Sequence, residues 1–133
     1  MHRYTDLNLT RQLSLVFDQL EPELIGLTGG TLVVCIRNDL VGKFGVKHDA
    51  MESKDDKIVP LRNGLQKRHV TSFRLMAMEA LKRKKHWTHG EIVFDFTLKQ
   101  DTLLVSTWFE SNYNFANLVD HNLPMNSQRV SRL

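Results

Sequence analysis

The chain has 133 residues, of which 41% are hydrophobic and 25% charged, and its formal net charge is +3. This length suits one domain, and the composition excludes collagen-like, low-complexity and disordered chains. No apolar stretch approaches the roughly 18 residues that a membrane-spanning helix needs, and the first ten residues lack the apolar segment of a signal peptide. We therefore expect one cytoplasmic domain over residues 1–123, followed by a polar, basic and mobile tail over 124–133.

Cysteine usage bears on the compartment and on reactivity. Cys35 is the only cysteine, so no intramolecular disulfide can form. It lies in the apolar run 32–36, which predicts a buried, unreactive thiol. A chain without paired cysteines fits a reducing compartment.

The first periodic segment, residues 5–24, predicts a helix because its apolar residues recur at helical spacing. Pro22 either kinks this helix or opens a short second one, because it lacks an amide donor. Thr31–Arg37 and Leu40–His48 predict two strands of a hairpin with its turn at Asn38-Asp39. Residues 49–60 are polar and without period, which predicts a loop.

A second helix is expected from Leu61 or Gly64 to Lys85. Its apolar stripe comprises Leu65, His69, Val70, Phe73, Met76, Ala77, Ala80 and Leu81. We interpret His69 on this stripe as a core histidine with one satisfied hydrogen bond. Glu91–Lys99 and Thr102–Glu110 alternate strictly and predict a second hairpin with its turn at Gln100-Asp101. A short helix is expected within residues 111–121.

The order helix–hairpin–helix–hairpin predicts an α+β fold. We expect an antiparallel sheet of about four strands with two main helices on one face, plus the short C-terminal helix. A shift of sixty residues places Gly30, Leu32 and Val34 on Gly90, Ile92 and Phe94. This match indicates an α-β-β unit used twice, although any two helix–turn–strand segments share such a period.

No catalytic or metal-binding motif is present. The chain has no phosphate loop, nucleophile elbow or His-Glu-x-x-His. His86 and His89 are three residues apart, and His48 precedes several carboxylates, but neither group has the spacing of a known ligand set. We therefore expect no catalytic residues, no cofactor and no tightly bound metal, and a protein that is more plausibly not an enzyme.

Positive charge is concentrated on the second helix. Residues 61–86 carry eight Lys or Arg and one acidic residue. Such a stripe is typical of nucleic-acid binding, although cations near a helix C-terminus also complement the helix dipole. The candidate residues for an anion or nucleic-acid site are Lys67, Arg74, Lys82, Arg83, Lys84 and Lys85.

Apolar residues on faces that a monomer exposes predict a partner. Leu75 and Met78 lie outside the main apolar arc of the second helix. On the sheet face away from the helices, we expect Val33, Val93, Leu104 and Trp108. These six residues form the predicted partner interface, and a homo-oligomer is the simplest cover for them. The same sheet face offers a candidate ligand pocket at Arg37, Asp95 and Trp108, with Asp95 facing Arg37 across the sheet.

These patterns favour a non-enzymatic binding or regulatory module that acts through protein–protein contacts and self-associates, as a homodimer in the simplest case. The first alternative is a nucleic-acid-binding protein that uses the basic helix 62–85. The second is a small enzyme or ligand sensor with a pocket on the open sheet face.

Overall fold

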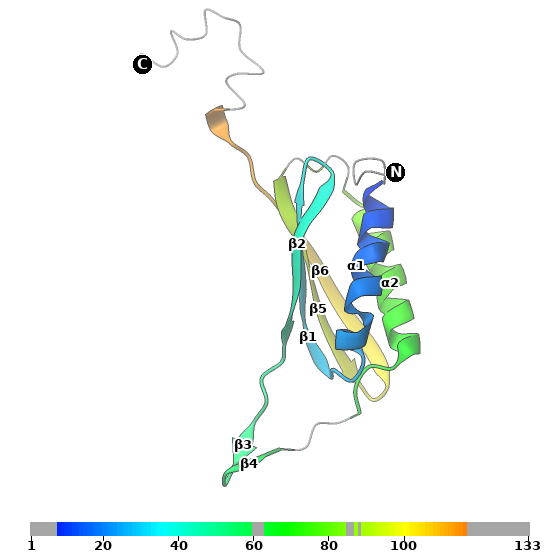
Figure 1. The fold of residues 1–133 in the computed structure, drawn as a ribbon, viewed down its shortest axis with the longest axis vertical. Helices are drawn as coiled ribbons and strands as arrows, with labels where there is room; N and C mark the ends of the chain where they lie inside the picture. Colours follow the sequence, from blue (N-terminus) through cyan, green and yellow to red (C-terminus); the bar gives the residue numbers. More distant parts are fainter. Residues whose placement is uncertain (1–7, 60–62, 85–86, 88, 117–133) are drawn as a thin grey trace, which may run out of the picture.

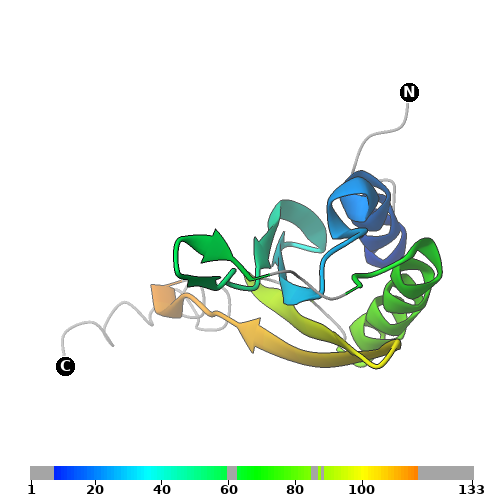
Figure 2. The ribbon, with the colours of Figure 1, turned by 90° about the horizontal axis from the view of Figure 1, so that it is seen from below.

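The computed structural model describes residues 8–59, 63–84, 87 and 89–116, and folds them into two layers. Two helices cover one face of a four-stranded antiparallel sheet (Figures 1 and 2). The helices are α1 (Leu9–Leu24) and α2 (Lys67–Leu81). The sheet has the order β2-β1-β5-β6, with β1 (Gly29–Arg37), β2 (Leu40–His48), β5 (His89–Lys99) and β6 (Thr102–Ser111). The predicted α+β fold and element order are confirmed.

Within the described residues, neither helix is long and apolar enough to cross a membrane. Of the expected C-terminal helix, only Phe115 and Ala116 are helical, and residues 117–121 lie outside the described part of the chain. The predicted tail, residues 124–133, also lies outside it.

Helix α1 starts where a capping side chain replaces a missing backbone partner. The Asn8 side chain accepts a hydrogen bond from the amide of Arg11 at 2.8 Å, which satisfies one free donor of the first turn. Pro22 lies inside the last turn and the helix continues to Leu24, so Pro22 opens no second helix.

Helix α2 is shorter than expected at both ends. It ends at Leu81, so the described cations of residues 82–84 follow the helix instead of lying on it. At the other end, the predicted first turn pairs with the connection between α1 and β1. Leu65 is buried ahead of the helix, and its backbone exchanges 2.8 Å hydrogen bonds with Gly26 and Leu27 in the α1–β1 connection. The buried stripe of α2 passes through Phe73 and Ala77. Met76 is 41% exposed, so its predicted place in the core is wrong: it lies to one side of that stripe.

Three hairpin turns share one backbone geometry. Asn38-Asp39 and Gln100-Asp101 both have two successive residues with positive φ, between 48° and 65°. This is the geometry of two-residue turns that match the twist of antiparallel strands, and Asn and Asp tolerate it. Both turns were predicted. Asp55-Asp56 makes a third such turn between β3 (Ser53–Lys54) and β4 (Lys57–Ile58), within the segment predicted to be a loop.

Aromatic rings fill the centre of the layer between helices and sheet. Phe73 of α2 packs against Phe17 of α1, with ring centroids 5.0 Å apart. It also packs against Phe94 and Phe96 of β5, at 5.8 and 5.0 Å. These four side chains are at most 2% exposed. Phe73 therefore joins both helices to the central strand.

The sixty-residue shift that aligns the two halves of the sequence also relates their paired strands in the sheet. Strand β1 pairs with β5 so that Val33 lies opposite Val93, sixty residues further on. Leu32 pairs with Phe94 and Val34 with Ile92, so the same shift exchanges these two pairs. The units α1-β1-β2 and α2-β5-β6 are thus arranged about an approximate two-fold axis that is perpendicular to the sheet and passes between Val33 and Val93.

Candidate functional site

The sheet face opposite the helices, here called the open sheet face, is formed by alternate residues of all four strands. The strand registers align these residues in rows that run from β2 to β6. The middle row is Gly45, Val33, Val93 and Trp108. The row on one side is Lys47, Thr31, Asp95 and Ser106. On the other side lie Cys35, Glu91 and Glu110, with Lys43 of β2 lining the same cleft as Cys35.

The middle of the open sheet face is apolar. Trp108 is 50% exposed, and Leu104, opposite Thr97 on the neighbouring strand, is 48% exposed. Val33 is half-buried, whereas Val93 is only 5% exposed because Val33 and Trp108 flank it. The four predicted sheet residues therefore share one face, with most of the accessible apolar surface on β6.

Charge divides the open sheet face into two halves. Arg37, Lys43 and Lys47 lie on β1 and β2. Glu91, Asp95 and Glu110 lie on β5 and β6, with Lys99 at the turn end of β5. One side of the face is therefore positive and the other is predominantly negative.

Two polar contacts join these halves across the β1–β5 pair. The Thr31 hydroxyl donates to Asp95 Oδ1 at 3.2 Å, and Cys35 Sγ lies 3.9 Å from Glu91 Oε2. Cys35 is half-buried rather than buried, because it is on the open sheet face and no layer covers it. Its predicted burial is wrong.

The predicted ligand pocket is not assembled. The register places Arg37 beside His89 and Asp95 beside Thr31, so these two side chains do not face each other. Six residues of extended strand separate His89 from Asp95, which is roughly 20 Å. Arg37 instead lines a cleft of about 420 Å³ with Lys43, Glu91 and Glu110, and Asp95 lies outside it.

A second opening lies on the helix side, between α1 and the edge strand β2. It encloses about 670 Å³ and is lined mainly by apolar side chains, including Leu15, Leu20, Val41 and Phe44. Leu15, which lines this opening, is 50% exposed. Gln12 closes one end, donating to Asp39 O at 3.1 Å and accepting from the Val41 amide at 2.7 Å.

Several cations of the predicted nucleic-acid site are engaged within the fold. The Arg74 guanidinium lies 2.7 Å from Asp18 and also donates to the Ser14 backbone and hydroxyl oxygens. Lys82 pairs with Glu79 at 3.3 Å, and the Lys84 ammonium sits 4.9 Å from the centre of the Trp87 ring. Lys67 and Arg83 are exposed, and Lys85 lies outside the described residues. The positive charge of the helix is thus partly neutralised by contacts that hold the domain together.

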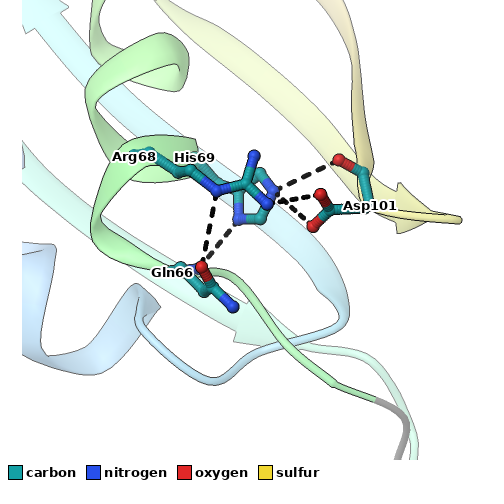
Figure 3. A network of polar contacts seen from close by, with 4 residues as sticks. All are labelled: Gln66, Arg68, His69 and Asp101. Carbon is teal, nitrogen blue, oxygen red and sulfur yellow. Dashed lines mark hydrogen bonds and ion pairs between the residues drawn. The ribbon is translucent and has the colours of Figure 1, made fainter.

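His69 fastens the first turn of α2 to the β5–β6 turn (Figure 3). Its Nδ1 accepts a 2.9 Å hydrogen bond from the Gln66 amide, so a neutral ring carries its proton on Nε2. Nε2 faces Asp101, 3.3 Å from the carbonyl oxygen and 3.2 Å from Oδ1. Arg68 also donates to Asp101 Oδ2. His69 is 4% exposed, so its interpretation as a hydrogen-bonded core histidine is confirmed.

These contacts change the acidity of Asp101. The hydrogen bond from Arg68, aided by the positive charge of Arg68, lowers the pKa of the Asp101 carboxyl below its ordinary value. The carboxyl is exposed, so solvent screens the interaction. The cluster holds a turn in place; it presents no nucleophile to the histidine.

In the described ranges, no three His, Cys, Asp or Glu residues are grouped to hold an ion. His48 pairs with Glu23 at 2.7 Å, His89 is exposed at the start of β5, and His86 lies outside the described ranges.

The two helix residues of the predicted partner interface lie apart from the four sheet residues. Leu75 is 59% exposed on α2, whereas Met78 is half-buried. They lie on the opposite side of the molecule from the open sheet face, so the six predicted interface residues do not form one surface.

Sequence reasoning missed two features near the site. Trp87 is 2% exposed and packs edge-on against Phe109 of β6 at 5.5 Å. A lone tryptophan between two histidines gives no period that signals burial. The second feature is a pair of protruding segments, the β3–β4 hairpin and residues 112–116, which both lie on the open side of the sheet (Figures 1 and 2). The sequence signal for these segments was apolar residues within polar stretches, such as Ile58 and Phe115, which the structure leaves exposed.

Comparisons with known proteins add no assignment: no family model, curated protein or solved structure matches the chain.

Proposed function

We propose that the protein is a non-enzymatic interaction module that self-associates through its open sheet face. The observation that carries this proposal is the apolar middle of that face, where Trp108 and Leu104 are each about half exposed while both helices cover the other side. Covering the exposed half of each side chain contributes on the order of 1–3 kcal/mol. Tryptophan is also among the residue types that most often dominate the binding energy of an interface.

The chemistry of the surroundings supports binding rather than catalysis. The histidine–aspartate pair at His69 and Asp101 fastens a turn, and the cations of α2 are partly committed to Asp18, Glu79 and Trp87. The open sheet face instead combines an apolar centre with charged margins, which is the usual arrangement of a protein–protein interface.

Trp108→Glu tests this proposal in sedimentation velocity over a concentration series. We expect the unmodified chain to dimerise at or below about tens of micromolar, within the affinity range of standard interfaces. Trp108→Glu is expected to raise the dissociation constant at least ~tenfold, because it places a charge where an interface anchor is buried. The helix content should be unchanged.

Leu75→Glu is the matched control. Leu75 is as exposed as Trp108 but lies on the outer side of α2, so this change adds the same charge away from the open sheet face. The proposal predicts that Leu75→Glu leaves dimerisation unchanged. A monomeric parent chain, or a dimer that only Leu75→Glu dissolves, contradicts it.

A further inference from the structure

We propose that two copies stack face to face through their open sheet faces about a two-fold axis parallel to the strands, so that β2 of each copy lies over β6 of the other. This inference rests on the proposed function and specifies the partner's orientation and the residues that pair. It follows from the sizes and charges that the strand registers align in rows.

Two symmetric arrangements can stack such faces. Packed sheets lie about 10 Å apart with nearly aligned strands, and a two-fold axis makes the contact closed and self-complementary. An axis along the strands places β2 over β6 and β1 over β5, and keeps each row over itself. An axis across the strands places each strand over its own copy and exchanges the two outer rows.

Side-chain size in the middle row favours the axis along the strands. In that arrangement, Trp108 of one copy lies over Gly45 of the other, and Val93 lies over Val33. A Cβ added at Gly45 meets no atom within 4 Å, so the surface there is open. The other arrangement places Trp108 over Trp108 and Gly45 over Gly45. Two large side chains would then collide at one edge, and an unfilled space would remain at the other.

Charge in the outer rows favours the same arrangement. Lys43 has no direct partner in the irregular β1–β2 register, but it lines one cleft with Cys35 and Glu110. An axis along the strands brings this edge of the face, with Lys43, over Glu110 of the other copy. It also places Lys47 of one copy diagonally across from Asp95 of the other. An axis across the strands exchanges the rows, so that Lys43 faces Lys47 and Glu91 faces Asp95. Complementary potentials orient partners and like charges in contact exclude wrong orientations. The division of charge thus selects one orientation.

The protruding segments extend the surface that a second copy would meet. The β3–β4 hairpin and residues 112–116 lie at opposite ends of the strands, and both are on the side away from the helices (Figure 1). They carry exposed apolar side chains: Ile58 at one end, Tyr113 and Phe115 at the other. An axis along the strands keeps like ends of the strands together, so the segment that follows β2 of one copy extends from the edge that lies over β6 of the other.

Charge reversal at one predicted pair distinguishes the two orientations. Lys43 and Glu110 are both exposed, so reversing either leaves the core intact. We expect Lys43→Glu alone, or Glu110→Lys alone, to raise the dimer dissociation constant roughly tenfold or more, since each creates a like-charged pair twice in the dimer. The double variant should return to within about threefold of the parent. With the axis across the strands, Lys43→Glu removes a lysine–lysine contact and strengthens the dimer.

Mixing the two single variants shows that the pairing is between copies. One carries Glu at both positions and the other carries Lys at both, so each homodimer is weakened while the mixed pair is complementary. With one variant labelled with ¹⁵N, native mass spectrometry should show the mixed dimer in excess of the statistical half. A statistical mixture overturns the proposed orientation.

Filling the open space at Gly45 gives a test independent of charge. Gly45→Leu should weaken the dimer at least as much as one charge reversal, because the added side chain occupies the place of the partner's Trp108. An unchanged dissociation constant overturns the orientation. If Trp108→Glu dissolves the dimer but Gly45→Leu and both charge reversals do not, the orientation is wrong and the proposed function stands. If the parent chain never dimerises, both fail.

Discussion

The two halves of the domain share a backbone plan but differ in what holds each helix to its own hairpin. In the first half, the neutral side chain of Gln12 bridges the β1–β2 turn at Asp39 and Val41. In the second half, the side chains of Arg68 and His69 bind the carboxylate of Asp101 in the β5–β6 turn, and the pKa of this carboxyl is lowered. Each helix is therefore attached to its own hairpin, by a pH-independent contact in the first half and by a pH-dependent contact in the second.

The halves also differ on the open sheet face, and there the difference bears on function. Under exact two-fold symmetry, both halves of the face would carry equal charge, and the two stacking orientations would be equivalent. Instead, the β1–β2 half is positive and the β5–β6 half is mostly negative, with Gly45 in the first matched against Trp108 in the second. This difference between the two halves makes the two stacking orientations unequal, and the proposed dimer rests on that inequality.

The largest expected difference between the two halves is in the free energy of unfolding that is lost when a core residue is truncated. Phe73 stands sixty residues after Leu13, and both are buried, but only Phe73 packs against three other rings. Phe73→Ala should lower the free energy of unfolding by about 3–5 kcal/mol. The loss should exceed that of Leu13→Ala by about 1 kcal/mol or more, because each aromatic pair adds about 0.5–1.5 kcal/mol. Urea denaturation at a protein concentration where the dissociated form prevails measures both.

Leu75→Ala on the same helix is the control for that series. Leu75 is 59% exposed, and such surface changes alter stability by no more than about 0.5 kcal/mol. Equal losses for Leu13→Ala and Phe73→Ala would show that the two halves contribute alike to the core.

A smaller effect should appear as pH falls. The pKa of Asp101 is lowered in the folded state, so its contacts stabilise the domain above the unfolded-state value of about 4 and are lost as pH falls through the folded value. Between pH 7 and pH 3, amide exchange should become faster, relative to the intrinsic rate, at the β5–β6 turn. Asp101→Asn should remove most of this pH dependence.

The β1–β2 turn supplies the internal control for the exchange experiment. The Val41 amide donates to the side chain of Gln12, which does not titrate, so relative protection at Val41 should not depend on pH over this range. An equal loss of amide protection at both turns in acid would contradict the assignment of a pH-independent contact to one turn and a pH-dependent contact to the other.

Sequence alone was enough to predict the fold class and the order of the main elements, because periodic signals are local. Alternation in residues 91–110, helical spacing around Leu13 and Phe73, and the turns at Asn38-Asp39 and Gln100-Asp101 each reflect the geometry of neighbouring residues. The Asp55-Asp56 turn was missed because its strands have two residues each, too few to show a period.

The site was only partly predictable because it depends on register. The outward-facing residues of each strand follow from alternation, so Trp108 and Leu104 could be placed on the open sheet face. Which residues become neighbours across β1 and β5 depends on pairing between distant segments, and this is why Arg37 and Asp95 were wrongly joined. The roles of Arg74 and Trp87 depend on tertiary contacts that leave no pattern in the sequence.

The most direct test of self-association through the open sheet face follows the two tryptophans in one sample. Trp87 is 2% exposed and Trp108 is 50% exposed, so 5-fluorotryptophan labelling gives one buried reporter and one on the proposed interface. As the protein concentration rises to about tens of micromolar, the expected interface range, the Trp108 ¹⁹F resonance should shift and lose its sensitivity to solvent D₂O, while the Trp87 resonance stays unchanged. A Trp108 resonance that remains solvent-sensitive and independent of concentration while sedimentation shows a dimer, or in a chain that stays monomeric, would contradict the account.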